Sequence, residues 1–88
     1  MNAIEVTIVG KPGCHLCDDA RAVVSSVVTE LTEPPAALDI AVKEASIFDD
    51  AELYDAYVEE IPVILVNGRV HTYCRVDPAR FRKALQEV

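Results

Sequence analysis

The chain has 88 residues, enough for one small hydrophobic core, and we expect residues 1–88 to form a single domain. Hydrophobic residues make up 51% of the sequence, a share that suits a compact core and argues against a disordered chain. The formal net charge of −7 argues against nucleic-acid binding, and no apolar run is long enough to span a membrane.

The first half of the chain predicts a strand, a helix and a second strand. Residues 4–9 alternate and are rich in β-branched side chains, as in a strand, and residues 11–13 interrupt them. Apolar residues then recur with helical spacing over residues 16–31. The two prolines at positions 34–35 end this helix, because proline cannot continue its hydrogen bonds. Alternation over residues 38–42 predicts the second strand.

A short helix and a hairpin are predicted next. Asp49 or Asp50 can cap a helix that carries apolar residues up to position 58. The continuous apolar run of residues 61–66 suits a strand that is buried on both faces. An Asn-Gly pair follows it, which is a strong signal for a tight hairpin turn. We therefore expect the chain to return in a strand over residues 69–75.

The last helix is predicted to begin at Asp77 and Pro78, a cap and a first helical residue in the order that helices prefer. Its expected apolar face consists of Phe81, Ala84, Leu85 and Val88. The element order is then β-α-β-α-β-β-α. Because a β-α-β unit pairs its strands in parallel and a hairpin adds an antiparallel pair, we predict an α/β fold with a four-stranded mixed sheet flanked by three helices.

Two cysteines stand where the first strand passes into the first helix. Cys14 lies at or before the first turn, and Cys17 follows three residues later. Free backbone N–H groups and the helix dipole stabilise negative charge there, so we expect Cys14 to be the nucleophile that attacks a disulfide. Cys17 would then resolve the mixed disulfide. Lys11 adds positive charge nearby, and a protonated His15 would tune the pKa of the Cys14 thiol.

The cysteine count and the N-terminal sequence indicate the compartment. Three cysteines do not suit a disulfide scaffold, and a close Cys-x-x-Cys pair more often serves redox or metal chemistry. Residues 1–10 lack the basic region and long apolar stretch of a signal peptide. We therefore expect a cytoplasmic protein, where thiols stay reduced, and a monomer as the default.

Residues 11–17, Lys-Pro-Gly-Cys-His-Leu-Cys, resemble the active-site loop of the glutaredoxin family, which commonly reads Lys-x-x-Cys-Pro-Tyr-Cys. Ile61-Pro62 matches the position of the family's cis-proline, and the element order agrees over nearly the whole chain. The resemblance implies the thioredoxin/glutaredoxin fold, with a cis Pro62 facing the two cysteines and the backbone of Ile61 pairing with substrate. We expect Lys11 to join these two residues in substrate binding.

The same resemblance implies the activity of a thiol–disulfide oxidoreductase that needs no metal or other cofactor. Its substrates would be disulfide-containing proteins or low-molecular-weight thiols, and a reductase or a small thiol would recharge it. No nucleic acid and no membrane are expected among its partners.

The loop after the hairpin departs from the family pattern. Glutaredoxins commonly carry Gly-Gly, then one residue, then an acidic pair, and these groups help to hold glutathione. Counted from Pro62, the glycines fall on Thr72 and Tyr73 and the acidic pair on Arg75 and Val76. The chain is therefore closer to a divergent branch, or to redoxins recharged by thioredoxin reductase, than to a typical glutathione user.

Two other classes of function stay open. One is a non-catalytic module that binds a partner protein through the cis-proline groove. The other is a metal-binding protein, because His71 and Cys74 with the two motif cysteines supply four potential zinc ligands. The family resemblance also implies, as an alternative, an iron–sulfur cluster that is bridged between two subunits, usually with glutathione as co-ligand. Strand alternation argues against zinc, since it places Val70, Thr72 and Cys74 on one face and His71 and Tyr73 on the other.

Overall fold

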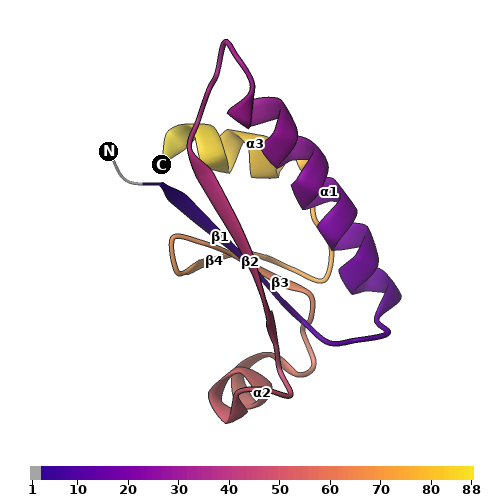
Figure 1. The fold of residues 1–88 in the computed structure, drawn as a ribbon. Coiled ribbons are helices and arrows are strands. Elements are labelled where there is room, and N and C mark those ends of the chain that lie inside the picture. The colour runs from indigo at the N-terminus through magenta and orange to yellow at the C-terminus, as the bar shows by residue number, and fades with distance from the viewer. Residues whose placement is uncertain (1–2) are drawn as a thin grey trace.

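The computed structural model describes residues 3–88 as a four-stranded sheet with three helices (Figure 1). The strands are β1 (Ile4–Gly10), β2 (Ile40–Ser46), β3 (Val63–Val66) and β4 (Arg69–Tyr73), and the helices are α1 (His15–Thr32), α2 (Ala51–Tyr57) and α3 (Pro78–Glu87). In the sheet order β2-β1-β3-β4, β1 runs parallel to β2 and antiparallel to β3, and β4 is antiparallel to β3. The predicted α/β class, element order and mixed sheet are confirmed.

Each helix begins at a side chain that accepts hydrogen bonds from its free N–H groups. Asp50 caps α2, and Asp77 caps α3, which has Pro78 at its start. The cap of α1 is Cys14, whose sulfur accepts a hydrogen bond from the backbone N–H of Cys17. The helix that starts at the cysteine motif is therefore capped by the motif itself.

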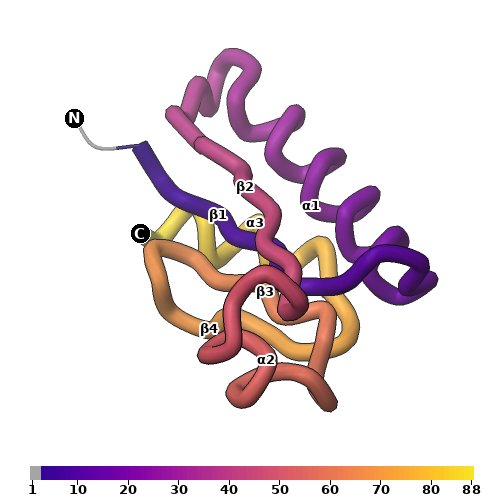
Figure 2. The backbone as a smooth tube through the Cα atoms, turned by 60° about the horizontal axis from the view of Figure 1, so that its bottom comes forward, coloured from indigo at the N-terminus to yellow at the C-terminus, as the bar shows by residue number. Residues whose placement is uncertain are grey.

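The two faces of the sheet are covered by different helices. α1 and α3 pack on one face, and α2 lies against the other, as Figure 2 shows from a second direction. The larger cluster of buried side chains, under α1 and α3, consists of Val6, Ile8, Ala20, Val24, Val27, Leu31, Ile64, Val66, Phe81 and Leu85. The smaller cluster, on the side of α2, is built on Val9, Ile47 and Val63. β3 contributes to both clusters, which explains its continuous apolar run. Within residues 3–88, no helix is long and apolar enough to cross a bilayer.

Four predicted boundaries differ from the structure. The fourth strand ends at Tyr73 rather than at residue 75. The second strand spans Ile40–Ser46 rather than residues 38–42, because it pairs in parallel with the full length of β1. The third strand begins at Val63 rather than at residue 61, since Pro62 has no N–H to donate to a neighbouring strand. Val88, which we assigned to the apolar face of the last helix, follows the end of α3 and is 62% exposed.

β4 contains a bulge that overturns the predicted alternation of its side chains. Ile64 pairs with Thr72, but the next residue of β3 pairs with Val70, so His71 is the extra residue of the strand. Val70 and Thr72 therefore point to opposite faces, and the prediction that they share one is wrong. The His71 ring packs against Phe81 of α3, with 5.7 Å between the ring centroids.

The packing of α3 predicts that shortening a side chain inside the helix and shortening one just after its end have very different effects on the free energy of unfolding. Leu85 is 1% exposed, whereas Val88 is 62% exposed. Replacing Leu85 by alanine removes buried methyl groups and leaves a cavity, so the free energy of unfolding should fall by about 2–5 kcal/mol. Val88→Ala, the matched control, should change it by less than about 0.5 kcal/mol. Urea denaturation followed by circular dichroism measures both, and equal losses would contradict this packing.

Candidate active site

The two cysteines of the motif lie where β1 turns into α1. β1 ends at Gly10, and Gly13 supplies the left-handed backbone of the turn with a φ of 74°. Cys14 caps the helix, and its sulfur lies 3.3 Å from the backbone nitrogen of Cys17, which donates the hydrogen bond. Both cysteines are free thiols. The turn therefore brings the two sulfur-bearing residues together at the end of the sheet.

Cys14 is the partly exposed member of the pair and has the more acidic thiol. The side-chain interaction with the Cys17 thiol is the largest influence that lowers the pKa of the Cys14 thiol below its usual value. Partial burial opposes it, and the backbone N–H of Cys17 adds a smaller lowering effect. The N–H of Leu16 and the charge of Lys11 lower this pKa further. These groups favour the thiolate, as expected at a helix N-terminus. Cys14 thus combines thiolate character with access from solvent.

Cys17 differs from Cys14 in both respects. Its side chain is buried, with 1% exposed. Burial, together with the interaction with Cys14, raises the pKa of the Cys17 thiol to about 11. Its sulfur lies close against Gly10, where an added Cβ would come within 2.8 Å of the Cys17 Sγ. Glycine at position 10 therefore leaves the space that the protonated thiol occupies.

Pro62 lies beside the same turn. The Ile61–Pro62 peptide bond is cis, and the Pro62 side chain is fully buried. β3 starts directly after Pro62 and pairs antiparallel with the end of β1, so one further step along this register brings Pro62 alongside Gly10. The Pro62 carbonyl accepts a hydrogen bond of 2.7 Å from the N–H of Cys74. Ile61 is half-buried next to it.

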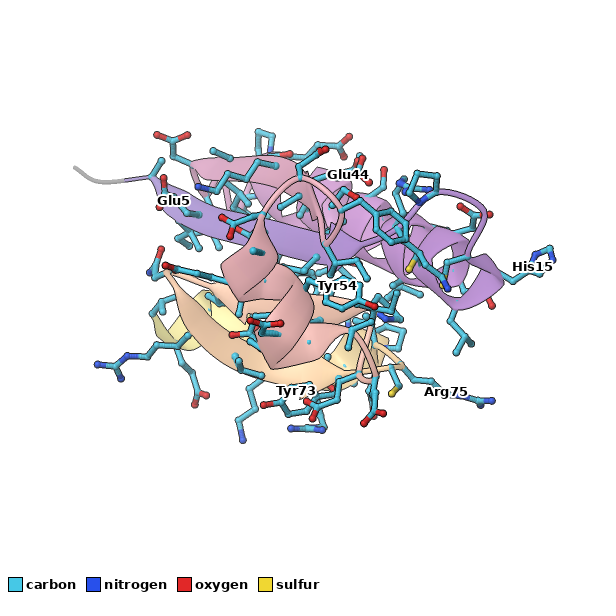
Figure 3. All side chains as sticks on the ribbon, turned by 90° about the horizontal axis from the view of Figure 1, so that it is seen from below. Glu5, His15, Glu44, Tyr54, Tyr73 and Arg75 are labelled. Atoms are coloured by element: carbon cyan, nitrogen blue, oxygen red, sulfur yellow. The ribbon has the colours of Figure 1, made fainter. Side chains whose placement is uncertain are left out.

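Lys11 and His15 occupy the surface on either side of Cys14. Lys11 is exposed, and its charge is one of the influences that lower the pKa of the Cys14 thiol. His15 is the first residue of α1, and its ring points away from the molecule into solvent (Figure 3). The structure places Lys11 with the nucleophile and turns the His15 ring outward, and a tuning role for His15 stays a prediction.

Cys74 lies in the loop after β4, where its backbone has a φ of 63°. Its thiol is within 3.7 Å of the Glu60 carbonyl oxygen, to which it donates a hydrogen bond. Across residues 3–88, no three His, Cys, Asp or Glu side chains come close enough to hold a metal ion. The described residues therefore do not bring His71 and Cys74 together with the two motif cysteines as one set of ligands.

Arg21 is a member of the site that the sequence motif does not reveal. It lies one helical turn after Cys17, and its positive charge lowers the pKa of the Cys17 thiol against the larger effect of burial. Its guanidinium is 2.8 Å from a carboxylate oxygen of Asp18 and 2.8 Å from one of Glu44. The four-residue spacing from Cys17 is the signal in the sequence that points to it.

The chain matches the family model of the Glutaredoxin-like domain (DUF836) over residues 5–86. Its structure is similar to that of protein XcR50 from X. campestris, with a TM-score of 0.72 and 27% identity over 94% of this chain and 97% of that chain. No curated protein matches the sequence significantly.

Two more distant structures show the fold alone. Protein Ne2328 from Nitrosomonas europaea has a TM-score of 0.69 and 15% identity, covering 96% of this chain and 93% of that chain. Oxidised mitochondrial thioredoxin 3 from Saccharomyces cerevisiae has a TM-score of 0.68 and 11% identity, covering 100% of this chain and 81% of that chain. The predicted thioredoxin-type fold is confirmed.

The contrast between the two thiols predicts selective alkylation of the reduced protein. At neutral pH iodoacetamide should modify Cys14 and leave Cys17 unmodified, because the thiolate is the reacting form and a thiol with a pKa of about 11 stays protonated. Since the pKa of Cys14 is lowered, its alkylation rate should reach half of its maximum at a lower pH than that of a free thiol. Peptide mapping by mass spectrometry gives the rate at each site. Protein unfolded in urea is the control, where both should react alike; equal rates in the folded protein would contradict the assignment.

Proposed function

The chain belongs to the family of the glutaredoxin-like domain, and from this premise we propose that it is a thiol–disulfide oxidoreductase with Cys14 as nucleophile and Cys17 as resolving thiol. The asymmetry of the pair carries the proposal. Cys14 is partly exposed with a lowered pKa, and Cys17 is buried with a raised one. The Cys14 thiolate can therefore attack a disulfide that arrives from solvent, while Cys17 stays protonated until the mixed disulfide has formed.

The reaction has two exchange steps. The Cys14 thiolate attacks one sulfur of the substrate disulfide, whose S–S bond breaks, and half of the substrate leaves as a thiolate. Cys17 then loses its proton to water and attacks the Cys14 sulfur, which releases the second half and forms the Cys14–Cys17 disulfide. The substrate gains two electrons and the protein loses two. A reductase or a small thiol returns the pair to the dithiol form.

The segment before β3 supports a binding role next to the cysteines. Pro62 is alongside Gly10, and the half-buried Ile61 precedes it. We propose that the backbone of Ile61 pairs with an extended segment of a disulfide-containing protein or with a small disulfide, as the family resemblance implies. Lys11, whose charge acts on Cys14, contributes positive charge to the same encounter.

The loop after β4 favours a reductant other than glutathione. Counted from Pro62, the family's glycine pair falls on Thr72 and Tyr73, and both positions carry side chains. Asp77, the acidic residue nearest to the position of the family's acidic pair, uses its carboxylate to cap α3. A protein reductase is the electron donor we propose.

Serine substitutions at the two cysteines test the proposed function. Cys14→Ser should reduce turnover of a model disulfide, with dithiothreitol as the recharging thiol, to the uncatalysed rate. Incubated with the model disulfide in the absence of dithiothreitol, Cys17→Ser should accumulate a mixed disulfide on Cys14, visible by intact-mass spectrometry, because the resolving thiol is missing. Cys74→Ser is the control and should keep the wild-type rate. Two results together would support a non-catalytic binding module instead. The wild-type protein would show no turnover, and Cys14→Ser would bind a partner with the same affinity as the wild type.

A further inference from the structure

A small cavity lies behind the thiol of Cys17, between α1, the end of β2 and the start of the turn that follows β1. Its volume is about 270 Å³, which leaves room for several water molecules at roughly 30 Å³ each. Four charged residues line it together with Cys17: Lys11, Arg21, Glu44 and Asp49. The buried thiol thus shares this cavity with four charged side chains.

Arg21 forms ion pairs with two carboxylates at this cavity. Its Nη1 donates to Asp18 Oδ1 at 2.8 Å, and its Nε and Nη2 lie 2.8 Å from Glu44 Oε1. Asp18 belongs to α1 and Glu44 to β2, so the guanidinium bridges the helix and the edge strand. Arg21 also lies four residues after Cys17, on the same side of α1. Residues of two elements therefore orient its guanidinium, on the helix that also carries Cys17.

The second exchange step requires the Cys17 thiol to lose its proton, although its surroundings favour the protonated form. Burial and Cys14 raise the pKa of its thiol, whereas the backbone N–H of Lys11 and the charge of Arg21 lower it. Glu44 and Asp49 face the cavity with the opposite charge. Glu44 is bound to the guanidinium, so its charge is partly offset there. Arg21 is thus the side-chain charge that acts in favour of the Cys17 thiolate.

Resting on the proposed function, we infer that Arg21 is a positioning residue for the resolving step. Held by Asp18 and Glu44, it stabilises the thiolate that Cys17 forms when it displaces the product, and the proton passes to water in the cavity. The bond between Cys14 and the substrate sulfur breaks, the Cys14–Cys17 bond forms, and the substrate leaves with the electron pair. Arg21 itself touches neither substrate nor the reacting sulfur of Cys14 in this scheme.

Stopped-flow reaction with dithiodipyridine separates the two steps. This aromatic disulfide is uncharged, so the charge of Arg21 does not act on the reagent, and each step releases one equivalent of the same chromophore. The first phase reports attack by Cys14 and the second reports resolution by Cys17. All samples carry Cys74→Ser, so that the exposed third thiol adds no signal.

Arg21→Gln should leave the first phase within about twofold and slow the second by about three- to tenfold at neutral pH, because a half-exposed charge acts through partial screening. The midpoint of the second phase should move to higher pH by about half to one unit. Arg21→Lys should restore most of the rate. Added salt should slow the second phase of the wild type and have little effect on Arg21→Gln.

Arg82→Gln is the matched control, because Arg82 also pairs with a carboxylate, that of Glu30, but lies on α3 away from the site. A second phase that keeps its rate and pH profile in Arg21→Gln, or that slows equally in Arg82→Gln, would overturn the inference alone. A wild-type protein that releases one equivalent without a second phase would overturn the proposed function and this inference with it.

Discussion

The hydrogen bond from the backbone N–H of Cys17 to the sulfur of Cys14 is the interaction on which the candidate site depends. It caps α1, and so it connects the start of a long helix to the chemistry of one thiol. The Cys17 thiol has the largest effect in lowering the pKa of the Cys14 thiol, and this backbone bond lowers it further, because the donor favours the charged sulfur. The turn that allows it requires two glycines for different reasons. Gly13 adopts a left-handed backbone, and Gly10 makes room for the sulfur of Cys17.

The spacing of the motif makes the two cysteines different. The buried face of α1 repeats with the helical period, and Cys17 is the first residue of that stripe. Three residues earlier the chain is not yet helical, so Cys14 stands outside the core at the cap. Cys17 is therefore buried because it follows the helical period of the core residues, and Cys14 is partly exposed because it precedes the first turn of the helix. The remaining members of the stripe are Ala20, Val24, Val27 and Leu31.

Patterns within a single element could be predicted from the sequence, and features that depend on a partner element could not. Helical and strand periodicity, capping residues and the cysteine motif gave the element order and placed Cys14 at the start of α1. The bulge at His71 was missed because residues 69–75 show regular alternation, and the extra residue is defined only by pairing with β3. The role of Arg21 was missed for a similar reason. Its partner Glu44 is 23 residues away in the sequence and reaches it through the parallel pairing of β2 with β1.

Burial of the resolving thiol creates a conflict that the cavity behind it relieves. A buried Cys17 is protected from reagents in solvent, but burial also keeps it protonated and hence slow to attack. Greater exposure would speed ionisation and lose the protection. A positive charge near the Cys17 thiol stabilises its thiolate without exposing the thiol to solvent, so the residue can be both protected and able to ionise. Arg21 lines the cavity next to this thiol, and two carboxylates orient its half-exposed guanidinium. The reactivity of Cys17 then depends on a charge beside it as well as on the surface on which Cys14 meets its substrate.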